Sequence, residues 1–96
     1  MPLRIDEYVI NTLMPDLVGH GHQPSAFLVY LQLWYRSRGR AGQVPMSHRD
    51  IADATGLSKS AVQASIRTLI RRRLIRATRE SSTSVPRYAV LKPWIR

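Results

Sequence analysis

Residues 47–74 read SHRDIADATGLSKSAVQASIRTLIRRRL, and this stretch predicts two helices joined by a tight turn. Ser47 is placed to accept a hydrogen bond from a backbone N–H of the first helical turn, and Asp50 completes a pair resembling a capping box. Gly56 suits the left-handed conformation that ends many helices, and Ser58 suits the cap of the next helix. The pattern therefore predicts a helix-turn-helix unit over residues 47–74.

The second of these helices has two contrasting faces. At 100° per residue, Val62, Ile66 and Leu69 share one face, with Ile70 at its edge. The opposite face carries two small residues and two arginines: Ser60, Ala64, Arg67 and Arg71. Small residues let a helix approach a surface closely, and arginine makes bidentate contacts with guanine in the major groove of DNA. The sequence therefore predicts a recognition helix for double-stranded DNA at residues 59–73.

Other residues are expected to support this helix at DNA. Gln63 and Thr68 flank the same face and are predicted to reach base edges or phosphates, and Lys59 in the first turn suits a phosphate. Ser47, at the start of the first helix, completes this group of candidate DNA-binding residues.

The run from Ser47 to Gln63, followed by LIRRRLI at residues 69–75, resembles the winged helix-turn-helix of bacterial regulators of the MarR and GntR type. It is equally similar to the winged-helix domains of some plasmid and phage replication initiators. The specific signature is alanine at 52, glycine at 56 and valine at 62. The resemblance covers residues 25–91 and implies a mostly α fold with a small β-hairpin wing (α+β), built on a three-helix core plus an N-terminal helix.

Residues 74–91 have the composition of the hairpin that such a fold needs. Two strand-like segments, 74–80 and 85–91, flank the turn SSTS at residues 81–84. In the resembled family the wing lies along the DNA backbone or enters the minor groove. The resemblance therefore makes residues 79–87 the DNA-facing part of the wing, with Arg79, Ser82 and Arg87 as candidate contacts.

The N-terminal third is predicted to support this unit. Asp6 can cap a short helix that runs to about Met14 and ends before Pro15, and residues 17–23 are expected to form a loop. A longer helix is expected from Pro24 to near Gly39. Its apolar face is predicted from the spacing of Phe27, Leu28, Leu31 and Trp34 or Tyr35.

Two further segments complete the expected fold. Residues 42–46 suit a short first strand, in which Pro45 indicates the edge of a sheet because it lacks an N–H. Trp94 and Ile95 are expected to be buried against the N-terminal helices or against a second subunit. A homodimer through the N-terminal helix and this tail is a hypothesis.

The net charge of +9 is concentrated in one half of the chain. Residues 1–57 hold five basic and five acidic residues, whereas residues 58–96 hold ten basic residues and one acidic residue, Glu80. This distribution is typical of binding to a polyanion. The alternative is a solvated basic face with no partner.

Composition also argues against other classes of protein. The 96 residues fit a single domain spanning 1–96, with no cysteine for disulfides or thiolate metal sites. No apolar run reaches the length of a membrane span and no signal peptide is evident, so we expect a cytoplasmic protein without membrane partners. His20 and His22 are interpreted as solvated loop histidines rather than metal ligands. We predict neither a cofactor nor an enzyme, because no catalytic set or glycine-rich phosphate loop is present.

These features favour a sequence-specific binder of double-stranded DNA, namely a bacterial transcriptional regulator. A DNA-binding domain of a plasmid or phage replication-initiation or partition protein is the first alternative. A winged helix that binds another protein is the second, although such a module would tend to expose apolar or aromatic anchors on its binding face. A small-molecule effector cannot be inferred from the sequence.

Overall fold

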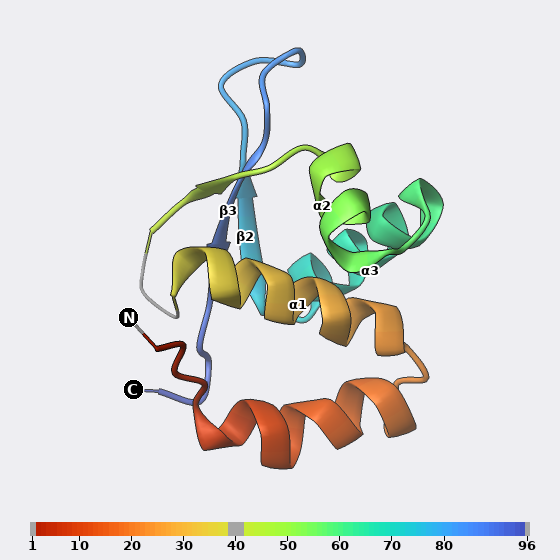
Figure 1. Ribbon diagram of the computed structural model, residues 1–96, viewed down its shortest axis with the longest axis vertical. Helices are drawn as coiled ribbons and strands as arrows, with labels where there is room; N and C mark the ends of the chain where they lie inside the picture. Colours follow the sequence, from red (N-terminus) through yellow and green to blue (C-terminus); the bar gives the residue numbers. More distant parts are fainter. Residues whose placement is uncertain (1, 39–41, 96) are drawn as a thin grey trace.

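A computed structural model describes residues 2–38 and 42–95, which form a mostly helical fold with a small antiparallel sheet (Figure 1). The elements follow one another as η1 (Val9–Leu13), η2 (Asp16–His20), α1 (Pro24–Ser37), β1 (Val44–Pro45), α2 (His48–Thr55), α3 (Lys59–Arg71), β2 (Ile75–Thr78) and β3 (Arg87–Val90). The predicted α+β winged helix-turn-helix is therefore confirmed.

The N-terminal helix is longer than predicted. Residues 7–20 are helical without a break and include two π-helical segments, η1 and η2, so the predicted loop beginning at Leu17 was wrong. Pro15 lies within this continuous helix, directly before η2, and its φ of −63° fits a helical backbone. Leu17 is fully buried, so its side chain anchors the continued helix to the core.

Helix α1 lies at the centre of the molecule, between the N-terminal helix and the helices α2 and α3 (Figure 1). Phe27 is buried as predicted, but Leu28 is 45% exposed, so assigning it to the buried face was wrong. Of the alternatives Trp34 and Tyr35, Trp34 is the buried residue and Tyr35 is 48% exposed. Because neighbours cover α1 on several sides, its buried residues include positions outside a simple stripe: Ala26, Phe27, Val29, Tyr30, Leu33 and Trp34. The helix ends at Ser37, and the predicted end near Gly39 lies outside the described residues.

The helix-turn-helix forms through the local signals seen in the sequence. Ser47 Oγ accepts from the Asp50 N–H at 3.0 Å, and the Asp50 carboxylate accepts from the Ser47 N–H at 3.1 Å, which completes a capping box. Gly56 ends α2 with a φ of +80°, in the left-handed region where glycine carries no steric cost. Ser58 then caps α3 by accepting from the Ala61 N–H at 3.1 Å. These contacts confirm the predicted caps and turn.

The end of α3 forms a Schellman motif without glycine. The Leu74 N–H donates to the Leu69 carbonyl at 2.9 Å, and the Arg73 N–H donates to the Ile70 carbonyl at 3.0 Å. Arg73 has a φ of +58°, so an L side chain stands at the position that glycine usually fills. The backbone at Arg73 is therefore strained.

We expect Arg73→Gly to raise the free energy of unfolding by about 0.5–1 kcal/mol. Relief of the left-handed strain, about 1–2 kcal/mol, exceeds the entropy that glycine adds to the unfolded chain. Urea denaturation followed by circular dichroism measures the change. Arg73→Ala removes the same charge but keeps a Cβ at this φ, so a gain as large in Arg73→Ala would contradict the strain explanation.

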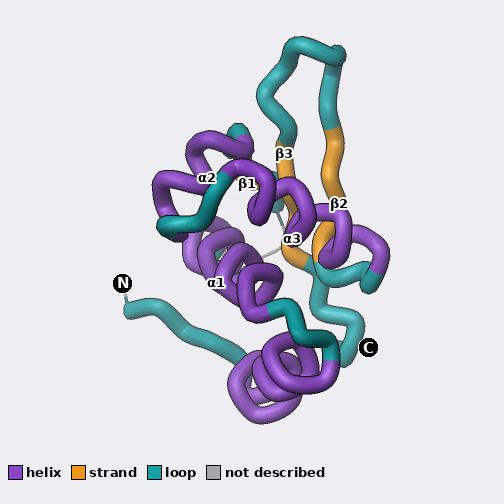
Figure 2. The backbone as a smooth tube through the Cα atoms, turned by 90° about the vertical axis from the view of Figure 1, so that its right-hand side faces the viewer, coloured by secondary structure: helices purple, strands orange, loops and turns teal. Residues whose placement is uncertain are grey.

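The three strands form one antiparallel sheet in the order β1-β3-β2. Pro45 lies in the edge strand β1, opposite Arg87 of β3, as its missing N–H predicted. Strands β2 and β3 pair from Ile75 opposite Val90 to Thr78 opposite Arg87. The hairpin is confirmed with strands shorter than predicted, and its loop extends well beyond the helices (Figure 2).

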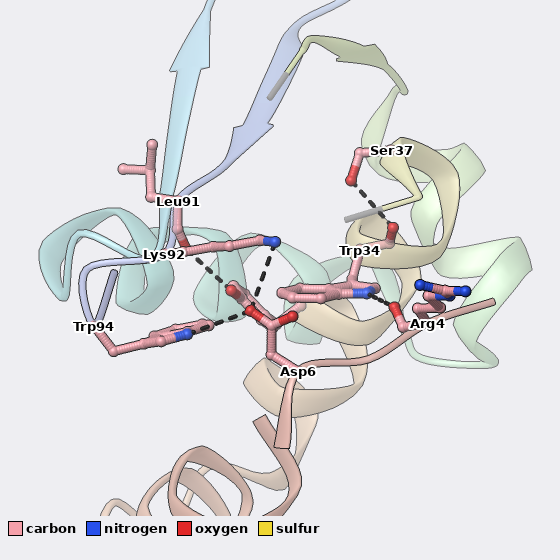
Figure 3. Close-up of polar contacts among 8 residues, drawn as sticks. Arg4, Asp6, Trp34, Ser37, Leu91, Lys92 and Trp94 are labelled. Atoms are coloured by element: carbon pink, nitrogen blue, oxygen red, sulfur yellow. Dashed lines mark hydrogen bonds and ion pairs between the residues drawn. The ribbon is translucent and has the colours of Figure 1, made fainter. Parts of the chain in front are cut away.

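Residues from the two ends of the chain meet on α1 (Figure 3). Trp94 stacks on Tyr8 with ring centroids 4.5 Å apart and on Trp34 at 6.5 Å, while Trp34 Nε1 donates to the Arg4 carbonyl at 2.8 Å. We call the contacts of residues 4–8 and 92–94 with Trp34 the terminal clasp. Trp94 is partly buried and packs against Tyr8 of the N-terminal helix, as predicted, but Ile95 is 55% exposed, so its predicted burial does not occur within this chain.

The carboxylate of Asp6 belongs to this clasp and not to a helix cap, so the predicted capping role was wrong. It accepts from Trp94 Nε1 at 3.4 Å and lies 3.6 Å from Lys92 Nζ. The Lys92 ammonium also lies 4.5 Å from the centre of the Trp34 ring. The Asp6 carboxylate therefore interacts with an indole N–H and an ammonium from the other end of the chain instead of capping the N-terminal helix.

Candidate nucleic-acid interface

The outward face of α3 presents the side chains that the sequence predicted. Its exposed positions include Ser60, Gln63, Ala64, Arg67 and Arg71, while Val62, Ile66 and Leu69 are buried beneath them. Neither Arg67 nor Arg71 forms a hydrogen bond or ion pair with any residue that the structure describes. Both guanidinium groups therefore remain available to an external ligand.

Thr68 does not belong to this face, although it was predicted to contact DNA. Its side chain is only 6% exposed, and Ser65 is 3% exposed. Helix α1 packs against α3, and the buried residues of α3 include these two hydroxyl side chains beside the apolar ones. Helical periodicity places Thr68 at the edge of the arginine face, and only the tertiary packing shows that this edge is buried.

The start of α1 borders the recognition face near Ala64. Ala61, Ala64 and Ser65 line a hollow of about 190 Å³ together with residues 22–26. The small side chains of α3 therefore leave space between the two helices. A surface that approaches Ala64 closely would also meet the segment that leads into α1.

The wing arginines make contacts within the wing. Arg79 donates to the Ser82 carbonyl at 3.2 Å, and Arg87 lies 3.4 Å from Glu80 in an exposed ion pair. Such exposed pairs contribute little to stability and exchange readily for other partners. The exposed Ser82 lies at the tip, where hydroxyls of neighbouring residues hydrogen-bond to one another.

Two predicted DNA contacts, Lys59 of the recognition helix and Arg79 of the wing, line the same concavity. It has a volume of about 280 Å³ and lies between the wing and the first turns of α2 and α3. Its lining consists of Ser47, His48, Arg49, Lys59, Arg79, Thr83, Ser84, Val85 and Pro86. We call it the wing-base concavity. The predicted candidates Ser47, Lys59 and Arg79 are thus brought together, whereas Ser82 and Arg87 are not among its lining residues.

His48 and Arg49 of this concavity were missed by the sequence interpretation. Burial lowers the pKa of the His48 imidazole, and the charges of Arg79 and Lys59 lower it further. The available signal was their position directly after the cap Ser47. These residues belong to the first turn of α2, which lies beside the wing. The concavity therefore joins three cationic side chains and a titratable imidazole.

Other kinds of site find less support. Within residues 2–38 and 42–95, no group of three or more His, Cys, Asp or Glu side chains is placed to hold a metal ion. The same residues contain no helix with the length and hydropathy needed to cross a bilayer.

Comparison with known proteins identifies a protein family. Searches of curated proteins and of solved structures returned no match. A family model described as a helix-turn-helix domain matches residues 23–75, which is more than half of the chain and spans from the residue before α1 to the first residue of β2. A domain of this kind suggests DNA binding, in agreement with the exposed arginine face of α3 and the basic concavity beside it. The chain therefore belongs to this family of helix-turn-helix domain proteins.

Proposed function

We propose that the protein binds double-stranded DNA sequence-specifically and acts as a bacterial transcriptional regulator. The observation that carries the proposal is the pair of unengaged arginines, Arg67 and Arg71, one turn apart on an exposed face of α3 that also holds Ser60 and Ala64. Arginine reads guanine through two parallel hydrogen bonds, and the small residues admit the helix into the major groove. Gln63 on the same face is a further candidate for base contact.

The distribution of charge supports this orientation. The sequence after residue 57 holds ten basic residues and one acidic residue. The basic residues include the cations of α3, of the wing and of the segment that joins them. With α3 in the major groove, the projecting wing at residues 79–87 would follow the backbone or enter the minor groove (Figure 2). Lys59 and Arg79 would then hold phosphates while Arg67 and Arg71 face bases.

We also propose that the protein binds DNA as a two-fold dimer. The N-terminal segment exposes Leu3, Ile5 and Ile10, and the C-terminal tail exposes Ile95. Exposed apolar side chains in these two segments would be covered in a symmetric dimer. Size-exclusion chromatography with light scattering tests this part, and a monomer at high concentration, with and without DNA, would exclude it.

Selection of bound sequences from a random duplex library tests the proposed function. A single motif that is enriched and bound far above random DNA supports sequence-specific binding, and a palindrome in that motif supports the dimer. Uniform binding that vanishes steeply with salt would replace specificity with an architectural role. Absence of binding at low salt would contradict DNA binding and favour a protein partner.

Lys59→Ala is expected to weaken binding to all duplex sequences alike. Loss of one phosphate contact should make the slope of log affinity against log salt shallower by about one unit. Arg36→Ala is the matched control, because it removes one exposed charge near the end of α1, outside the wing-base concavity. Equal slopes for Lys59→Ala and the unaltered protein would rule out a phosphate contact by Lys59.

A further inference from the structure

Four basic side chains from three separate segments line the wing-base concavity. His48 and Arg49 come from the start of α2, Lys59 from the start of α3, and Arg79 from the wing. The hydroxyls of Ser47, Thr83 and Ser84 lie along the same lining. Cations and hydroxyl donors are the groups that bind phosphate oxygens in proteins that contact nucleic acids. The lining therefore suits a single phosphate, held from the helix-turn-helix and from the wing together.

Two carboxylates that follow lining residues in the sequence, those of Asp50 and Glu80, already have other partners. Asp50, on the same helix as His48, accepts the Ser47 N–H in the capping box, and Glu80 in the wing pairs with Arg87. Arg49 and Lys59 form no hydrogen bond or ion pair within the described part of the chain. The positive charge around the concavity is thus largely uncompensated in the free protein.

His48 is the one side chain of this lining whose ordinary pKa lies near neutral pH. In the free protein, partial burial and the cations Arg79 and Lys59 all disfavour its protonated form, so its pKa is low. The charges that act on it are those of Arg79 in the wing and Lys59 in α3. Arg49 lines the same concavity. A phosphate anion among these groups would raise the pKa of His48, because a negative charge stabilises the protonated imidazolium.

We propose that the wing-base concavity holds one backbone phosphate of DNA and that His48 takes up a proton as this phosphate enters. The proposal rests on the proposed DNA binding and adds to it a dependence on pH. Because the pKa of His48 is then higher in the complex than in the free protein, protonation strengthens binding as the pH falls. The gain is complete below the free pKa and is lost as the pH rises through the pKa of the complex.

The dependence of DNA affinity on pH tests the proposal. A fluorescent duplex is titrated with the protein at constant ionic strength, between about pH 8 and about pH 6, where histidine changes charge. Each unit of difference between the two pKa values strengthens binding about tenfold at the lower pH. We expect the unaltered protein to gain at least about threefold more affinity over this range than His48→Gln, by the same relation. His20→Gln, which changes an exposed histidine of η2, should respond to pH like the unaltered protein.

A second measurement keeps the proposal testable if His48→Gln does not fold. Proton NMR of the His48 imidazole in the unaltered protein should show a higher pKa with the duplex than without it. An equal pH response in His48→Gln and in the unaltered protein, or an unchanged imidazole pKa, would overturn the proposal while leaving DNA binding intact. Failure of the unaltered protein to bind the duplex at any pH would instead overturn the proposed function itself.

Discussion

Trp34→Ala is expected to lower the free energy of unfolding by about 3–5 kcal/mol, the usual cost of truncating a large buried aromatic side chain. The Trp34 side chain is 1% exposed, and its ring contacts Tyr30 as well as Trp94 and Lys92 of the terminal clasp. Its indole N–H also holds the Arg4 carbonyl. A domain of this size has about 5–15 kcal/mol of stability in total, so the loss would be a large fraction of it.

Urea denaturation followed by circular dichroism measures this effect without relying on tryptophan fluorescence. Tyr35→Ala is the matched control, since Tyr35 is the next residue on α1 but is 48% exposed. Its replacement should change stability by no more than about 0.5 kcal/mol. Losses of similar size for Trp34→Ala and Tyr35→Ala would show that the terminal clasp does not stabilise the fold.

Replacing Arg67 or Arg71 by alanine is expected to cost about 1–3 kcal/mol at the preferred DNA site and to relax the base preference at one position. The reason is the loss of a bidentate hydrogen-bonding contact with guanine. Arg67→Lys and Arg71→Lys are matched variants that keep the charge but lose the planar guanidinium. We therefore expect the lysine variants to retain most of the affinity for random DNA and to lose specificity.

Competition binding against duplexes with a single changed base pair measures both quantities. If Arg67→Ala leaves the base preference unchanged but makes the salt dependence shallower, that arginine contacts a phosphate. If both arginine variants leave affinity and preference unchanged, the proposed orientation of α3 is wrong. A comparison of folding stability separates these outcomes from unfolding, and little change is expected because both side chains are exposed.

Local signals account for the parts of the fold that the sequence predicted well. The capping box of Ser47 and Asp50, the left-handed Gly56 and the cap Ser58 each act within three residues, so their spacing is sufficient to identify them. Asp6 shows the limit of this approach. Its partners Trp94 and Lys92 lie more than 80 residues away in sequence, and no local pattern distinguishes a carboxylate that caps a helix from one that binds a distant indole.

In the candidate DNA interface, too, the sequence predicted what depends on one helix and did not predict what depends on packing between elements. The exposed arginines of α3 followed from helical periodicity, because a single helix fixes which side chains share a face. The burial of Thr68 depends on the elements that pack against α3, and the approach of His48 to Arg79 depends on where the hairpin folds back. These are properties of packing between elements, so the wing-base concavity could not be recognised before the fold was known.

The terminal clasp needs a residue that is synthesised after the helices and the hairpin. The helices α1, α2 and α3 and the hairpin all end by residue 90. The indole that stacks on Trp34, however, belongs to residue 94. Synthesis runs from the N-terminus onward, so Trp94 can stack with Trp34 and Tyr8 only after residue 94 has been made. The recognition helix is thus able to form while the side of α1 that carries Trp34 still lacks this aromatic partner.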